Sequence, residues 1–109
     1  MADIFKVLGQ SAPAATTLTD LYTVPAARST TISTITVCNR AATAATFRIS
    51  LAPAGGVDAS SQYLYYDQAI DANSTFALTL GITLATTDKV RVYASTANLS
   101  FSAFGVEVA

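Results

Sequence analysis

The chain has 109 residues, enough for one domain with a single hydrophobic core and no metal or disulfide cross-links. Charged residues make up 12% of it, against roughly 25% in an average soluble protein, and the net charge is −1. The six basic residues are dispersed, which argues against nucleic-acid binding. No apolar run approaches the ~18–20 residues of a membrane-spanning helix, and the N-terminus lacks the pattern of a signal peptide. We therefore expect no nucleic-acid partner and no membrane partner.

The N-terminal segment, residues 1–15, is predicted to be an arm or a first strand followed by a loop. It contains Ile4 and Phe5 within a short apolar run. Such a run either adds a strand to a neighbouring subunit or forms the first strand of its own domain. Residues 16–109 are predicted to form a single β-sandwich domain.

Three strands are predicted in the first half of that domain. The first spans 16–24 and ends at a proline, which cannot donate to a sheet ladder. The second spans 29–39 and is rich in β-branched residues, but Ile32 is out of phase with the apolar residues that follow. A bulge near Ser33 would bring them into phase. The third spans 46–51, where three apolar residues alternate with polar ones: Phe47, Ile49 and Leu51.

The middle of the chain predicts a long connection and an aromatic strand. Residues 53–61 are rich in Gly and Ser and are expected to cross from one sheet to the other. Residues 62–70 then predict a strand with large side chains on both faces. Simple alternation places Tyr63 and Tyr65 on one face and Leu64 and Tyr66 on the opposite one. A turn is expected directly afterwards, at residues 71–73.

Three alternating segments end the chain: 76–82, with Leu80 among the inward residues, then 88–93 and 98–108. The spacing between them is that of hairpins. The last segment changes phase at Ala103–Phe104, which predicts a bulge or a bend between sheets. Short strands without helical periodicity, about eight in all, predict an all-β fold: an antiparallel β-sandwich, jelly-roll-like in its arrangement.

The sequence carries little that could do chemistry. It has no histidine, so the commonest general base and metal ligand is missing. The single cysteine, Cys38, has no CxxC neighbour and lies in an apolar strand, where we expect it to be buried. The spacing of Asp67, Asp71 and Asn73 is not that of a calcium loop, and these residues are expected to form a turn. We therefore expect no catalytic residue, no metal and no cofactor, and no enzymatic activity.

The outward positions of the predicted strands are mostly Thr, Ser and Ala. Such a surface is explained if copies of the chain or a partner cover it, or if hydroxyl groups keep a monomer soluble. The candidate interface residues are five apolar or aromatic side chains: Ile4, Phe5, Tyr63, Tyr65 and Tyr66. Tyrosine is common in interfaces because a large apolar ring carries a polar tip. The tyrosines could instead fill the two sides of an ordinary sandwich, or stack on a sugar ring.

Several phrases along the chain resemble one group of proteins. They are Leu21-Tyr-Thr-Val-Pro25, Ile35-Thr-Val-Cys-Asn-Arg40, Phe47-Arg-Ile49, Tyr63-Leu-Tyr-Tyr-Asp67, Lys89-Val-Arg-Val-Tyr93 and Phe101-Ser-Ala-Phe-Gly-Val-Glu107. Together they resemble the small all-β virion proteins of tailed bacteriophages. That resemblance implies a head decoration (cement) protein, or a small neck or tail component. Such proteins commonly assemble as trimers over junctions between capsid subunits. The phrases include no residue-level motif for the contact.

The expected function is therefore that of a non-enzymatic virion structural protein that binds and stabilises a phage capsid. The resemblance implies a homo-oligomer, a trimer, with the major capsid protein or another virion protein as partner. The single cysteine and the lack of a signal-peptide pattern point to synthesis in a reducing cytoplasm, that of the host, and the resemblance implies a place on the capsid exterior. The alternatives are a neck or tail component and a carbohydrate-binding or receptor-binding β-sandwich module. A small hydrolase is disfavoured because the chain has no histidine.

Overall fold

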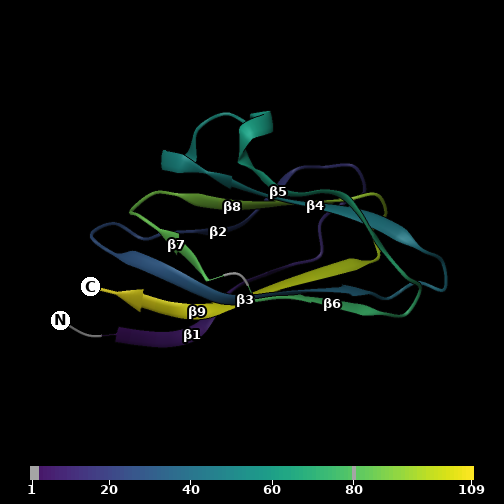
Figure 1. The fold of residues 1–109 in the computed structure, drawn as a ribbon, viewed down its shortest axis with the longest axis horizontal. Helices are drawn as coiled ribbons and strands as arrows, with labels where there is room; N and C mark the ends of the chain where they lie inside the picture. The colour runs from purple at the N-terminus through teal and green to yellow at the C-terminus, as the bar shows by residue number, and fades with distance from the viewer. Residues whose placement is uncertain (1–2, 80) are drawn as a thin grey trace.

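A computed structural model describes residues 3–79 and 81–109. In these residues the chain forms nine strands and two short 3₁₀ turns. The strands make two antiparallel sheets that pack face to face (Figure 1). The predicted all-β antiparallel sandwich is therefore confirmed, with nine strands where about eight are expected from turn spacing.

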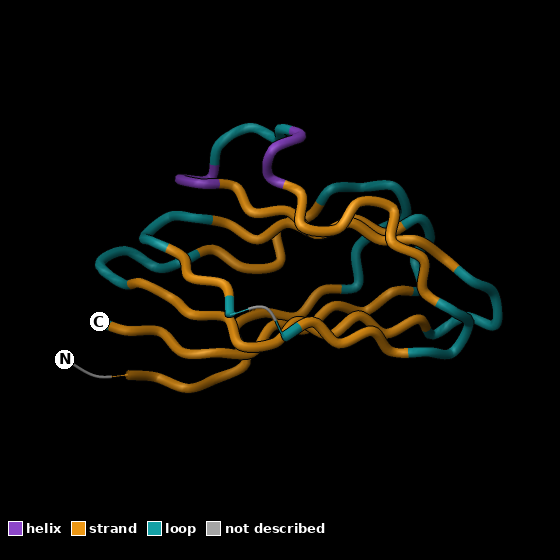
Figure 2. Tube along the Cα trace, in the orientation of Figure 1, coloured by secondary structure: helices purple, strands orange, loops and turns teal. Residues whose placement is uncertain are grey.

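The first sheet, here the β9 sheet, has the order β1 (Asp3–Ser11), β9 (Leu99–Val108), β3 (Ser29–Asn39) and β6 (Thr75–Leu78), with β7 (Ile82–Leu84) also paired to β3. The second, here the β4 sheet, has the order β2 (Thr19–Thr23), β8 (Lys89–Ala94), β4 (Ala45–Ala52) and β5 (Tyr63–Ile70). The 3₁₀ turns η1 (Pro53–Gly55) and η2 (Ser60–Gln62) lie between β4 and β5. They project beyond the β4 sheet (Figure 2).

Most connections pass from one sheet to the other. Only β4–β5 and β6–β7 join strands of the same sheet. The expectation that residues 53–61 cross between sheets is therefore wrong, because they join two paired strands of the β4 sheet. The hairpin links expected at 86–88 and 95–98 are also wrong, because each of these links changes sheet. Packed sheets lie ~10 Å apart, a distance that four extended residues can span, so loop length alone does not reveal a crossing.

The core lies between the sheets and is built by the expected alternation. Phe47 on β4 and Phe101 on β9 are fully buried and meet edge to face, with ring centroids 6.2 Å apart. Phe47 and Ile49 are fully buried, as predicted, and so are Val90 and Val92. The alternation changes phase after Ile49, where the β4–β5 register shifts: Ser50 is buried, and Leu51 is half-buried against the core.

Two bulges sit opposite the same point of β9. Pairing of β3 with β9 shifts register between Ile32 and Thr34, which confirms the bulge predicted near Ser33. Pairing of β1 with β9 shifts between Val7 and Gly9. The extra residues thus belong to the neighbouring strands. The bulge or bend predicted within β9 at Ala103–Phe104 is wrong, because β9 itself runs on without interruption and its apolar residues point to both faces.

Some predicted strand limits also change. The segment 76–82 is two strands, since pairing with β3 stops at Leu78 and resumes at Ile82. The predicted inward position of Leu80 lies outside the described residues. The strand expected over 16–24 spans Thr19–Thr23. Cys38 is half-buried, not buried, because its neighbours Val37 and Asn39 take the inward positions.

The N-terminal segment is the first strand of its own domain. β1 pairs antiparallel with β9 from Asp3 to Ser11 and leaves its other edge unpaired in the described chain. Of the two alternatives for residues 1–15, the structure therefore shows the first strand and a following loop.

A buried carboxylate fixes β1 and β2 to the sandwich. Glu107 on β9 is 1% exposed and accepts a 2.5 Å hydrogen bond from the hydroxyl of Tyr22 on β2. Lys6 on β1 and Arg28 in the β2–β3 loop each place a nitrogen 3.2 Å from its other oxygen. The hydrogen bond from Tyr22, followed by the one from Lys6, holds the pKa of Glu107 below its usual range despite burial. Burial, together with Glu107, raises the pKa of Tyr22 to about 12.

Candidate functional site

The outer face of the β9 sheet carries an exposed apolar strip. Register places Phe5 opposite Val106, and Val7 opposite Phe104. Directly opposite residues of an antiparallel pair share a face, so these four side chains lie together. Phe5 is 79% exposed and Val7 is also exposed. A soluble monomer seldom leaves so large a side chain uncovered beside other apolar groups, which makes this strip a candidate contact surface.

A groove of about 330 Å³ runs along the strip, lined by the apolar residues Phe5, Phe104 and Val106 and also by the charged side chain of Lys6. Gly105 lies at its base, between two backbones that approach closely. A Cβ atom on Gly105 would be 2.1 Å from the carbonyl oxygen of Thr31, a distance that real side chains do not tolerate. The Ser33 hydroxyl donates a 3.1 Å hydrogen bond to the Phe104 carbonyl and holds the bulge in place. The base of the groove is therefore set by backbone geometry, and the exposed side chain of Phe5 forms part of its wall.

The rest of this outer face is polar, with few charges. Its strand positions hold hydroxyl residues in rows, namely Thr31, Thr34, Thr36, Thr75, Thr83, Ser100 and Ser102, whose partners in register share the face. By register, Asp3 at the end of β1 is the charged strand residue that points to this face, and the half-exposed side chain of Lys6 reaches the groove from the same strand. A surface of hydroxyl and apolar groups can be covered by another protein without the cost of desolvating ions.

The outer face of the β4 sheet, in contrast, carries several charged side chains. The guanidinium of Arg48 on β4 lies between two tyrosine rings, 4.1 Å from the centroid of Tyr66 and 4.2 Å from that of Tyr93. Its Nε also lies 2.7 Å from a carboxylate oxygen of Asp67 on β5. The hydrogen bond to Asp67 raises the pKa of Arg48 further above its usual value. Ring stacking and the ion pair together hold this arginine flat on the sheet.

Two irregularities in β5 decide where the tyrosines point. The β4–β5 register shifts on both sides of Ile49, and each time the extra residue belongs to β5. Asp67 has φ +52°, a left-handed conformation that aspartate tolerates better than most residues. Tyr63 and Tyr66 consequently meet edge to face with centroids 5.0 Å apart. Tyr65 packs against the core rings of Phe47 and Phe76. The prediction that Tyr63 and Tyr65 share a face is therefore wrong.

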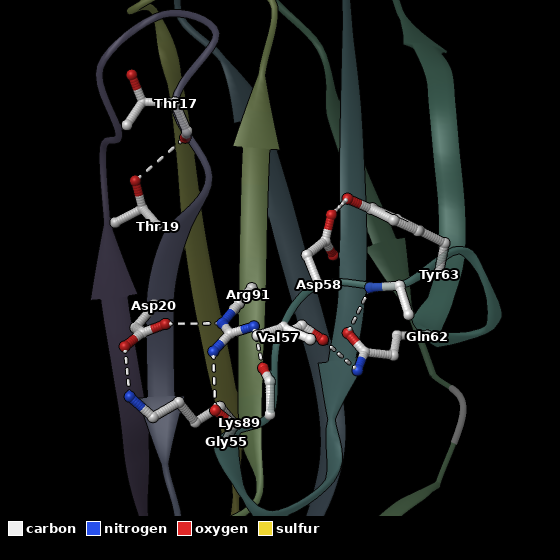
Figure 3. A network of polar contacts seen from close by, with 12 residues as sticks. Thr17, Thr19, Asp20, Gly55, Val57, Asp58, Gln62, Tyr63, Lys89 and Arg91 are labelled. Atoms are coloured by element: carbon white, nitrogen blue, oxygen red, sulfur yellow. Dashed lines mark hydrogen bonds and ion pairs between the residues drawn. The ribbon is translucent and has the colours of Figure 1, made fainter.

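A depression of about 610 Å³ lies beside these tyrosines, lined by Arg48, Asp58, Ala59, Ser60, Tyr63 and Tyr66. The Tyr63 hydroxyl donates a 2.8 Å hydrogen bond to Asp58, and Gln62 donates one of 3.0 Å to the carbonyl of Val57 (Figure 3). Burial and the hydrogen bond to Asp58 raise the pKa of Tyr63. These bonds fold the β4–β5 loop over one end of the sheet and give the depression a wall.

A second polar network fixes the base of the same loop. Arg91 donates hydrogen bonds to the carbonyls of Gly56 and Gly55, at 2.7 and 3.2 Å. It also contacts Asp20 at 3.2 Å, and Lys89 contacts the other oxygen of Asp20 at 2.8 Å (Figure 3). The hydrogen bond from Lys89 is the main cause that lowers the pKa of Asp20. The charges of this face are thus paired with one another.

The five residues predicted for an interface are divided between different places. Phe5 is in the apolar strip of the β9 sheet, whereas Ile4 pairs with Glu107 on the inward side of β1. Tyr63 and Tyr66 line the depression of the β4 sheet, and Tyr65 belongs to the edge of the core. Three residues of these surfaces were not predicted from the sequence as interface residues: Phe104, Val106 and Arg48. The phase change in the last strand was a signal for the first two, whereas nothing marked Arg48.

Comparisons with protein-family models, with curated proteins and with solved structures give no match for this chain. Within residues 3–79 and 81–109, no helix is long and apolar enough to cross a membrane. In the same residues, no three or more Asp, Glu or Cys side chains gather in a way that would hold a metal ion. The function must therefore be argued from the two outer faces and the resemblance of the sequence.

Proposed function

We propose that this protein is a non-enzymatic structural protein of a phage virion, which binds a capsid as a decoration protein and stabilises it. The observation that carries the proposal is the outer face of the β9 sheet, which has few charges (Asp3, and Lys6 at the groove) and bears Phe5 at 79% exposure. The resemblance of the sequence to small all-β virion proteins supports the same function and supplies the kind of partner.

The chemistry of the face suits a large protein contact. Burying a phenylalanine side chain contributes ~1.5–3 kcal/mol, and the groove beside Phe5 offers a place for an apolar side chain of the partner. Hydroxyl rows can donate and accept hydrogen bonds at the rim of such a contact. The centres of protein interfaces contain few charged residues, because burying an ion costs desolvation energy.

The partners we propose are other copies of this chain and the major capsid protein, on the outside of the virion. A trimer would present three such faces at once, so weak contacts would act together through their high effective concentration. A protein that binds the assembled shell and not its free subunits adds its binding free energy to the stability of the shell.

Two measurements test this proposal: the mass of the purified protein in solution, and its cosedimentation with undecorated capsids. We expect an oligomer that binds capsids and raises the temperature at which they rupture. A stable monomer that ignores capsids would contradict the decoration role. Binding to isolated necks or tails but not to capsids would also contradict it and would support the alternative location.

A pair of variants shows which surface makes the contact. Phe5→Ala should weaken capsid binding about tenfold or more, because the apolar anchor is lost, and should leave the free energy of unfolding within ~0.5 kcal/mol. Val57→Ala is the matched control, since Val57 is 87% exposed but lies in the β4–β5 loop on the other side of the sandwich. Equal loss in both variants would exclude the β9 face as the docking surface.

A further inference from the structure

We propose that the depression beside Tyr66, on the outer face of the β4 sheet, is a binding site for a neutral saccharide. This inference does not rest on the proposed capsid binding, because the two surfaces lie on opposite faces of the sandwich. The depression has a volume of about 610 Å³, within the roughly 300–1,000 Å³ typical of small-ligand sites.

The depression contains an exposed aromatic ring, that of Tyr66. Tyr66 remains 60% exposed although the guanidinium of Arg48 lies against its ring at 4.1 Å. The face of an aromatic ring is electron-rich and attracts the weakly positive C–H groups that cover one face of a pyranose. Tyr63 meets Tyr66 edge to face at 5.0 Å and extends the aromatic wall.

Charges of both signs surround the ring of Tyr66. The carboxylates of Asp58 and Asp67 lie close by and repel an anion such as a phosphate or a nucleic acid. Arg48 already occupies the cation position on Tyr66 and repels a second cation, such as the lysine of a peptide. The ligand that suits both conditions is neutral and carries many hydroxyl groups.

The wall of the depression also carries groups that can form hydrogen bonds. Asp58 and Ser60 line the depression, and a carboxylate can accept hydrogen bonds from two neighbouring hydroxyls of a sugar. The hydroxyl of Tyr63 holds Asp58 at 2.8 Å, and Arg91 fixes the base of the loop through the carbonyls of Gly55 and Gly56. The polar groups are therefore held in place before a ligand arrives, which lowers the entropic cost of binding.

The experiment uses the whole protein and a glycan array that holds neutral, sialylated and sulfated oligosaccharides. Each hit is titrated by isothermal calorimetry, and a lysine-rich peptide is titrated in parallel. We expect binding to neutral oligosaccharides. Tyr66→Ala should weaken it about tenfold or more, whereas Tyr66→Phe, which keeps the ring, should bind within about threefold of the unchanged protein. Phe5→Ala, on the other face, should bind the sugar unchanged.

Three results would overturn the inference. One is the absence of any neutral glycan among the hits, with none bound at millimolar concentration. Another is binding of only anionic glycans or of the lysine-rich peptide. The last is sugar binding that Tyr66→Ala leaves unchanged, with circular dichroism showing that the variant is folded. None of these results bears on capsid binding, so the two proposals fail separately.

Discussion

The two outer faces of the sandwich differ in the number of charged side chains that they carry. On the β4 sheet, Asp20 pairs with Lys89 and Arg91, and Arg48 pairs with Asp67. On the β9 sheet, the strand residues around Phe5 and Phe104 are mostly apolar or carry hydroxyls, and Lys6 reaches the groove beside them. One face thus pairs its charged groups with one another, whereas the other has few charges and bears an apolar groove beside the exposed ring of Phe5. The low overall charge of the chain is therefore unevenly distributed between the two faces.

The largest expected effect comes from the backbone under the apolar groove. Gly105→Ala should lower the free energy of unfolding by about 3 kcal/mol, because the new Cβ would meet the carbonyl of Thr31 and the strands would have to separate. Gly56→Ala is the control, since its Cβ would meet its nearest neighbour at 3.4 Å and its φ is −64°. Urea unfolding measures both variants. Equal stability of the two would show that the groove does not depend on this close approach.

A smaller effect is expected at Glu107, beneath the same face. Glu107→Gln should cost about 2 kcal/mol at neutral pH, because Lys6 and Arg28 lose their partner and Tyr22 keeps a weaker acceptor.

The pH dependence of stability should follow from the same cluster. The pKa of Glu107 is lower in the folded protein than its ordinary 4.5, so its contribution is present above about pH 4.5 and is lost as the pH falls through the folded value. The pKa of Tyr22 rises from 10.0 to about 12, so its contribution is present below pH 10 and is lost as the pH rises toward 12. Thermal unfolding across pH should show both limbs. Glu107→Gln should flatten the acid limb and Tyr22→Phe the alkaline one; unchanged limbs would contradict these assignments.

The smallest effect is expected on the charged face. Arg48→Ala should lower the free energy of unfolding by about 1 kcal/mol, because exposed ion pairs and ring contacts of arginine each contribute little. The loss should shrink in high salt, since the Asp67 pair is screened. The comparison of the two faces would need revision if Arg48→Ala destabilised the protein more than Gly105→Ala.

The sequence predicted the class of fold because burial leaves a period of two along strands such as β8 and much of β9. The bulge at Ser33 was also predictable, since Ile32 and Ile35 are both large and apolar and both must face the core. The sheet to which each strand belongs was not. Val90 and Leu99 both point inward, but they lie in different sheets, and inward direction is the same for either sheet. For that reason two expected hairpins are crossings and one expected crossing is a same-sheet connection.

The candidate sites show the same division. Phe5 was a candidate interface residue because of the apolar run near the N-terminus, but its neighbours come from β9, about a hundred residues further along the chain. The tyrosines were visible as a group, yet two extra residues in β5 bring Tyr63 beside Tyr66 and turn Tyr65 to the core. Arg48 carried no signal, because its role depends on rings from β5 and β8.

By itself, the sequence determined that this chain is a charge-poor β protein without histidine, because composition and alternation are local properties. Only the tertiary structure decided that five charged residues pair on one face while an apolar groove opens on the other: Asp20, Arg48, Asp67, Lys89 and Arg91. The physical reason is that strand pairing brings together residues far apart in the chain, and that bulges change which face a side chain joins.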